Sequence, residues 1–341
     1  MDFEIRLSQR SDPEVVGPYA SWAEELGARS VWSSEAGCDP FLPLVSAAMS
    51  TSKVELGTGI AVAFARSPYA TAQSAWYLHR VSGGRMVLGL GTQVKAHIER
   101  RYGMPWPGAG HALAEYIDCM REVWRSWQDK DSPKFVGKNW QATLTNPEFT
   151  PAPLPAGVGP IPVWIAAVGP TLLRIAARAA DGANFHAFTT PEYLRTFMHP
   201  AIDESRRAAG ITTPFRTGCC VLSGVVHDDW QLRQMRDHFR GIIAFYGSTP
   251  TYQPVLESVG YGDLMPELRQ LSRERQWDRM SSLVSDDLVD RMTLLDAPDA
   301  LGRKMVERYG DVLSQISIYR GGDRFMSGKD WEMLSQAVIG S

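Results

Sequence analysis

Short β-type segments alternate with longer helical ones along this chain, and their spacing sets the narrowest limit on its fold. The first four β-type segments begin near residues 3, 30, 54 and 86, at intervals of 27, 24 and 32 residues. Each interval is the length of one strand plus one helix. The intervening helices carry start and stop signals, such as Asp12-Pro13 before the first helix and Gly27 after it. Because no hairpin turn joins these strands, the pattern predicts a parallel sheet.

The same rhythm returns later in the chain, where four more β-type segments begin near residues 162, 183, 216 and 315. Eight βα units in order favour an α/β protein with a TIM (β/α)8 barrel over two Rossmann halves. The 341 residues exceed what eight such units need, and the surplus falls mostly at 92–160 and 228–310. We therefore expect a single barrel domain over residues 1–341, with insertions after strand four and before the last helix–strand unit.

Composition excludes several classes of protein. The chain is 44% hydrophobic and 21% charged with a net charge of −3, which is ordinary for a soluble protein and gives no general attraction to nucleic acid. The segment Met1–Arg6 holds two acids and a base, unlike a signal peptide, and no run reaches the length of a membrane helix. The four cysteines lack metal-binding spacing. We expect a cytoplasmic protein with no nucleic-acid partner, no membrane partner and no metal site.

Glycine-bearing turns follow two neighbouring strands at the barrel end where active sites lie. Gly91-Thr92-Gln93 follows strand four and Val168-Gly169-Pro170-Thr171 follows strand five, and each turn opens a helix whose free N–H groups can bind an anion. Four basic residues come soon after the first turn: Lys95, His97, Arg100 and Arg101. The combination suggests a phosphorylated ligand. The alternative is that the glycines serve only the turns and the basic residues form a solvated helix face.

Three segments carry a resemblance to a known family: Leu56–Pro68, Ser82–Arg101 and Ala244–Pro250. Over nearly its whole length the chain resembles the luciferase-like flavin and deazaflavin oxidoreductases, and most closely the branch that uses coenzyme F420. The resemblance implies a TIM barrel whose mouth receives the deazaflavin ring over a bulge at the end of strand three. It also implies a non-proline cis peptide bond at Gly59-Ile60 and a homodimer packed through the early barrel helices.

The same resemblance implies a hydride-transferring enzyme that acts on a small organic molecule. It places the phosphate of the cofactor tail at the two glycine-bearing turns, and the basic residues of the first turn could then meet the acidic end of that tail. The residues implied to bind the cofactor are Gly59, Ile60, Ala61, Thr92, Gln93, Val94, Lys95, His97, Arg100, Arg101, Ala167, Val168, Gly169, Pro170 and Thr171.

The rim after strand two departs from the family pattern. Many relatives carry an acid followed by histidine there, or a histidine before Asp-Pro-Phe, whereas this chain has Glu35-Ala36 and Cys38-Asp39-Pro40. Glu35, Cys38, Asp39 and His186 are therefore the candidates for proton delivery. Cys38 has the alternative of an inert thiol that lines the pocket, and Asp39 has the alternative of a helix N-cap.

Two other functions remain open from the sequence. The first is a luciferase-like monooxygenase that binds flavin mononucleotide (FMN), which would differ from the deazaflavin enzyme in its cofactor affinity. The second is a non-catalytic barrel that binds flavin or no cofactor at all, which would have a blocked mouth.

Overall fold

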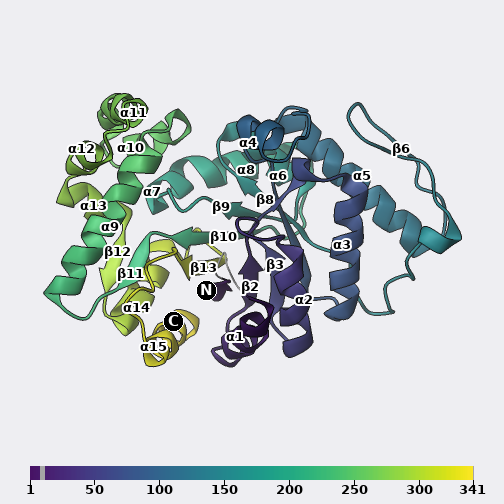
Figure 1. Ribbon diagram of the computed structural model, residues 1–341, viewed down its shortest axis with the longest axis horizontal. Coiled ribbons are helices and arrows are strands. Elements are labelled where there is room, and N and C mark those ends of the chain that lie inside the picture. The colour runs from purple at the N-terminus through teal and green to yellow at the C-terminus, as the bar shows by residue number, and fades with distance from the viewer. Residues whose placement is uncertain (8–11, 341) are drawn as a thin grey trace.

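A closed barrel of parallel strands forms the centre of the molecule (Figure 1). The computed structural model describes residues 1–7 and 12–340. Each barrel strand pairs in parallel with the next, and the ring closes where the first strand pairs with the last. In order around the ring the strands are β1 (Asp2–Arg6), β2 (Ser30–Ser33), β3 (Glu55–Thr58), β5 (Met86–Gly91), β8 (Val163–Ala167), β9 (Gly182–Phe185), β10 (Arg216–Val221) and β13 (Gln315–Ile318). The predicted TIM barrel is confirmed, because all eight strands lie where the spacing placed them.

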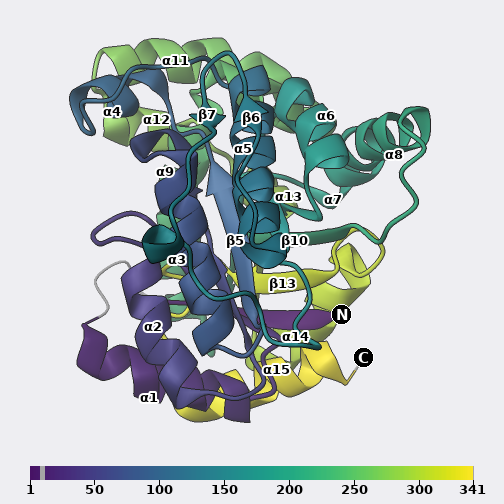
Figure 2. The same cartoon turned by 90° about the vertical axis from the view of Figure 1, so that its right-hand side faces the viewer.

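Helices cover the outside of the ring, and Figure 2 shows α3 and α5 flanking β5. Local signals fix where several begin: the Ser67 side chain accepts the N–H of Ala70 at the start of α3, and Ser327 and Asp330 form a capping box at α15. The covering helices are α1 (Pro13–Glu25), α2 (Phe41–Ser50), α3 (Pro68–Val81), α5 (Gly110–Asp129), α6 (Pro170–Ala179), α7 (Pro191–Tyr193), α8 (His199–Ala208), α14 (Pro298–Tyr309) and α15 (Gly328–Ile339).

Two of the segments beyond the eight units lie toward opposite ends of the longest axis, the one labelled β6 on the right and the one labelled α11 to α13 on the left, whereas α4 lies near the middle (Figure 1). Between β5 and β8 lie α4 (Lys95–Arg100) and the hairpin of β6 (Phe135–Val136) and β7 (Gln141–Ala142). Between β10 and α14 lie β11 (Ser223–Val225), α9 (Asp229–Gly247), α10 (Gln253–Ser258), α11 (Met265–Arg273), α12 (Trp277–Ser282), α13 (Asp286–Met292) and β12 (Leu294–Asp296).

The second of these segments is more regular than its sequence indicates. Residues 246–295 show no clear period, yet they form four short helices. In α11, for example, Met265, Leu268 and Leu271 are buried at three-residue spacing, so they form one apolar face of the helix. The strand expected over 216–226 also breaks at Leu222, and its second part pairs with β12 outside the barrel.

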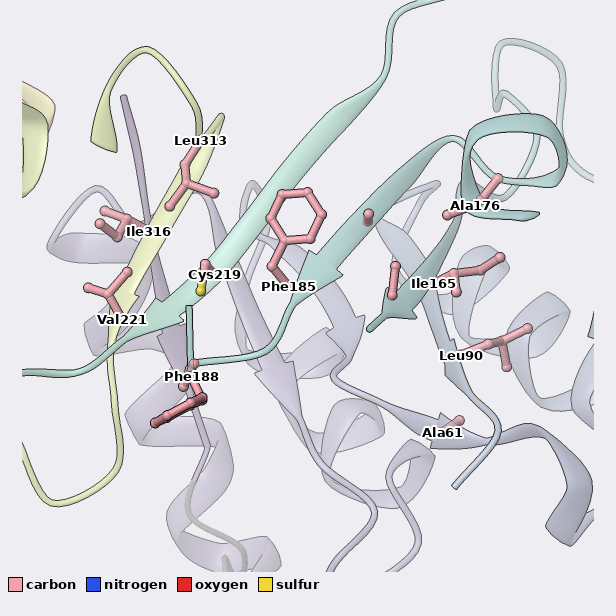
Figure 3. Packing of buried hydrophobic residues seen from close by; sticks show 14 of the residues in the cluster. Ala61, Leu90, Ile165, Ala176, Phe185, Phe188, Cys219, Val221, Leu313 and Ile316 are labelled. Carbon is pink, nitrogen blue, oxygen red and sulfur yellow. The ribbon is translucent and has the colours of Figure 1, made fainter. Parts of the chain in front are cut away.

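Along each strand, successive side chains point alternately outward to the helices and inward to the barrel interior. Figure 3 shows Leu90, Ile165, Phe185, Cys219 and Ile316 side by side on neighbouring strands, and these residues belong to the main hydrophobic core cluster. The inner layer holds Trp32 and Trp164, with ring centroids 5.4 Å apart. Gly57 and Gly182 make room for these rings, because an added Cβ would lie within 2.5 Å of one ring or the other. The tryptophans thus fill part of the interior between β2 and β8.

Among residues 1–7 and 12–340, no helix is both long and apolar enough to cross a membrane.

Candidate active site

A cavity of about 820 Å³ opens at the carboxyl ends of the barrel strands. This is the end of a TIM barrel where ligands bind, and the volume suits a ligand of cofactor size. Two facing sets of residues matter for its chemistry. The bulge wall consists of Ser34, Glu35, Gly59 and Ile60. The histidine wall consists of Asn184, His186, Tyr246 and Tyr319.

The bulge wall is built at the end of β3, where the Gly59-Ile60 peptide bond is cis, as the family resemblance implies. The loop after β2 holds this bulge by hydrogen bonds on both sides of the bond. The Ser34 hydroxyl donates to the Gly59 carbonyl oxygen at 2.8 Å, and the Glu35 N–H donates to the Ile60 carbonyl oxygen at 3.1 Å. β4 (Ala61–Val62) then continues the chain beside β5. The exposed surface of the bulge is therefore set by backbone contacts.

Glu35 lines the cavity, but its carboxylate is fully engaged in the protein. It accepts two hydrogen bonds from the Arg66 guanidinium, at 2.8 and 3.0 Å. It also accepts the Val62 N–H at 2.7 Å and the Tyr102 hydroxyl at 3.1 Å. The Glu35 side chain is only 6% exposed. These contacts tie the loop after β2 to the segment after β3, so the arrangement suits a structural anchor of the bulge better than a proton carrier.

Cys38 and Asp39 lie on the same rim but outside the residues that line the cavity. The N-cap of α2 is Pro40, not Asp39 as one alternative had it; Asp39 precedes it, and its carboxylate accepts the N–H of Phe41 at 2.8 Å and pairs with Arg66 at 3.1 Å. Burial, with a further contribution from the Asp39 charge, raises the pKa of the Cys38 thiol. Cys38 is therefore a protonated thiol at neutral pH, which is a poor nucleophile.

His186 projects from the end of β9 into the cavity and is held between two tyrosine rings. Its ring centroid lies 4.6 Å from that of Tyr246 and 4.9 Å from that of Tyr252. Its Nδ1 accepts the backbone N–H of Phe188 at 3.0 Å, so the neutral ring carries its proton on Nε2. Burial lowers the pKa of His186 to about 4. At neutral pH the residue is thus an uncharged hydrogen-bond donor.

Asn184 and a tyrosine pair complete the histidine wall. Asn184 is 6% exposed, and neither polar atom of its carboxamide has a hydrogen-bond partner among the described residues. Buried amides of this kind are rarely left unpaired, so its environment is incomplete without a further group. The hydroxyls of Tyr246 and Tyr319 lie 3.1 Å apart. Asn184 and His186 share one face of the β9 segment because strand residues alternate.

The expected cofactor-binding residues fall into two groups. Gly59, Ile60, Gln93 and Val168 line the cavity. Gly169 begins α6 with a φ of +78°, a conformation that glycine adopts readily, and the Thr251 side chain lies opposite it. The remaining residues of the expected set lie outside the cavity lining, and Lys95, His97, Arg100 and Arg101 are exposed on or just after α4. Lys95 lies 3.7 Å from Glu99, and Arg101 donates to the carbonyl oxygen of Ala36.

The sequence interpretation missed a set of polar residues in the cavity floor. Glu4, Arg6, Cys220 and Ser317 come from β1, β10 and β13 and line the same cavity. A signal was present, since Glu4 and Arg6 alternate with Phe3, Ile5 and Leu7. In a barrel strand that is covered on its outer face, such polar positions point inward.

Comparison with known proteins agrees with this architecture. The family model described as luciferase-like monooxygenase matches residues 4–315, so the chain belongs to that family. The uncharacterized protein Rv1360 of Mycobacterium tuberculosis is 38% identical over 295 residues, covering 86% of each chain. The putative coenzyme F420-dependent oxidoreductase Rv3520c of the same organism is 29% identical over 309 residues, covering 83% of this chain and 84% of the other.

Among solved structures, the coenzyme F420 dependent tetrahydromethanopterin reductase from Methanopyrus kandleri superimposes with a TM-score of 0.79 at 22% identity. The match covers 99% of this chain and 98% of the reductase. It shows that the two proteins share a fold.

Proposed function

We propose that this protein is an oxidoreductase that exchanges a hydride between coenzyme F420 and a small organic substrate. The observation that carries the proposal is the cavity itself, in which the backbone bulge at Gly59-Ile60 faces a wall of uncharged hydrogen-bonding groups. The similarity to the putative F420-dependent oxidoreductase Rv3520c supports the choice of cofactor.

The residues present fit a deazaflavin. The cavity is large enough for a tricyclic ring, and an added Cβ on Gly59 or Gly91 would lie 2.8 Å from a neighbouring side-chain atom, so the floor under the bulge is tightly built. Gly59, Ile60 and Ala61 would support the ring. Gly169-Pro170-Thr171 at the start of α6 would hold the phosphate. Lys95, His97, Arg100 and Arg101 would meet the acidic end of the tail.

When bound, the deazaflavin would itself accept or donate the hydride, and it lacks the ring nitrogen through which flavins react with oxygen. The protein's own part is to orient and polarise the substrate. His186 lines the cavity and carries its ring proton on Nε2, so this Nε2–H would serve as a neutral donor to a carbonyl or hydroxyl oxygen of the substrate. A neutral imidazole stabilises developing negative charge on that oxygen by hydrogen bonding. Glu35 and Asp39 hold Arg66 and the bulge in place.

The decisive experiment is a fluorescence titration of the apo-protein with coenzyme F420 and with FMN. We expect tight binding of F420 and weak binding of FMN, followed by turnover in a screen of carbonyl and alcohol substrates at the cofactor absorbance. Tight FMN binding without F420 binding would instead support the monooxygenase that the family description names. The open cavity beside Gly59 argues against the non-catalytic barrel, which would have a blocked mouth.

We further propose a homodimer packed through the early barrel helices. Leu42, Met49 and Tyr77 on α2 and α3 are 69%, 74% and 62% exposed, so these helices carry apolar surface that a second copy of the chain would cover. Light scattering on the purified protein tests this directly, with a mass of one chain as the contrary result.

A further inference from the structure

A line of polar side chains crosses the barrel interior from its amino end to the cavity. Glu55 pairs with Arg216 at 2.9 Å, and Arg216 donates to the Gln315 side-chain oxygen at 2.8 Å. Gln315 in turn donates to Glu4, whose carboxylate pairs with Arg6 at 2.6 Å. TIM barrels usually fill this space with branched apolar residues. We call these five residues the polar file.

The file ends on a cation at the cavity floor. Glu4 is fully buried, whereas the Arg6 side chain is 21% exposed and lines the cavity. An added Cβ on Gly59 would lie 2.8 Å from Arg6 Nη1, so the guanidinium lies directly beside the bulge. Its other nitrogens bind Glu4, and the Ser317 hydroxyl also donates to Glu4. The carboxylate therefore fixes the arginine from the side away from the bulge.

Burying these charged side chains costs desolvation free energy, so their presence calls for a role other than stability. Replacing a buried ion pair by apolar residues is often neutral or stabilising, since desolvation offsets most of the attraction. Large apolar side chains already fill the space beside the file: the guanidinium carbons of Arg6 and Arg216 lie 5.8 and 5.4 Å from the ring centroids of Trp32 and Trp164. The chain instead holds a positive charge beneath the place proposed for the redox ring.

We propose that Arg6, positioned by Glu4, makes the cavity bind the reduced form of the deazaflavin more tightly than the oxidised form. The inference rests on the proposed function. A bound deazaflavin ring would take up one negative charge with each hydride for as long as no proton follows from solvent, and the Arg6 guanidinium beside the bulge would stabilise that charge and disfavour its protonation. Arg6 is thus a binding residue that favours one redox state, and Glu4 is its positioning residue.

The test measures the ratio of the dissociation constants for oxidised and reduced coenzyme F420 by fluorescence titration under anaerobic conditions. In the double variant Glu4→Gln with Arg6→Gln, both charges of the pair are removed together, so no lone charge is left buried. We expect the preference of the wild-type protein for the reduced form to fall about 10-fold in this variant. For a two-electron couple, a tenfold change corresponds to a shift of about 30 mV in reduction potential.

Two single variants give matched controls with different expected signs. Glu4→Gln leaves the cation without its counter-charge, so the preference for the reduced form should rise several-fold. Arg6→Lys keeps the charge and should keep most of the preference. These two variants also decide the matter if the double variant fails to fold, because an unchanged ratio in Glu4→Gln would count against the proposal.

The binding measurements distinguish a wrong role for Arg6 from a wrong choice of cofactor. If wild-type protein binds both redox forms and the ratio does not move in the double variant, the role of Arg6 is wrong while the proposed function stands. If wild-type protein binds neither form of F420, both are wrong.

Discussion

The bulge wall and the histidine wall face each other across one cavity, yet they satisfy their polar groups in opposite ways. On the bulge wall, the Glu35 carboxylate has four hydrogen bonds from the protein, and the bulge carbonyls are bonded to the loop after β2. On the histidine wall, the buried amide atoms of Asn184 have no hydrogen-bond partner among the described residues, and His186 lines the cavity as a neutral ring with its proton on Nε2. The first wall is rigid before any ligand arrives. The second has hydrogen-bonding capacity left for one.

This difference suggests a division of labour between the walls. A fixed backbone surface suits a cofactor, because the same molecule binds there in every turnover. Unpaired neutral donors and acceptors suit recognition of an uncharged substrate. Four predictions test whether the walls differ as the contacts indicate.

The largest effect is expected on the bulge wall. Glu35→Ala leaves the Arg66 guanidinium with Asp39 alone as its carboxylate partner, and it leaves the Val62 N–H and the Tyr102 hydroxyl without their acceptor. It should therefore lower the free energy of unfolding by about 3–5 kcal/mol. Chemical denaturation measures this value. Arg303→Ala, which breaks an exposed pair with Asp299, is the matched control and should change stability by less than about 1 kcal/mol. Equal small losses in both variants would show that Glu35 is no anchor.

On the histidine wall, the His186 ring should make stability depend on pH. Its pKa is about 4 in the folded protein and 6.5 ordinarily, so the unfolded chain binds the proton first as the pH falls. The stability from this group is complete above pH 6.5 and is lost between pH 6.5 and 4, by on the order of 3 kcal/mol. Thermal melts across this range should therefore fall more steeply for wild-type protein than for His186→Phe. Parallel curves would contradict the assigned burial.

Asn184 should give effects of opposite sign with two substitutions of similar size. Asn184→Leu removes two unpaired polar atoms and should raise the unfolding free energy by about 1 kcal/mol, whereas Asn184→Asp buries a carboxylate and should lower it by more than that. Denaturation of the ligand-free proteins is the measurement. A loss of stability in the leucine variant would mean that the amide already has a partner.

The smallest effect is expected at the tyrosine pair. Tyr246→Phe removes one hydroxyl of a partly buried hydrogen bond to Tyr319 and should cost about 1 kcal/mol or less. Tyr261→Phe, which removes a more exposed bond to Asp287, serves as the comparison in the same melting experiment. A loss of several kcal/mol at Tyr246 would show that the histidine wall is as rigid as the bulge wall.

The barrel could be predicted from the sequence because each strand carries its own local signal. Buried strands such as Met86–Gly91 are short apolar runs bounded by glycine or proline, and their spacing fixes the topology. The helices of residues 246–295 could not be predicted, since each spans fewer than ten residues and takes its stability from packing.

The candidate site was predictable only in outline. The strand ends located His186, and the family resemblance located the bulge. The engagement of Glu35 depends on Arg66, a partner 31 positions away whose direction follows from tertiary structure. The N-cap role considered for Asp39 falls to Pro40 instead, and Asp39 accepts the N–H of Phe41 from one position earlier. The floor residues Glu4 and Arg6 become meaningful only when β1 is known to face the barrel interior.

The polar file also bears on how the barrel closes during folding. Gln315 and Ser317 lie on the last strand and bond to Glu4 on the first, more than 300 positions earlier. A slip of one residue in the pairing of β13 would turn both side chains outward and leave the Glu4 carboxylate without them in the interior. The contacts between the first and last strands therefore favour the correct register, because a shifted pairing would bury the Glu4 carboxylate without these two hydrogen-bond donors.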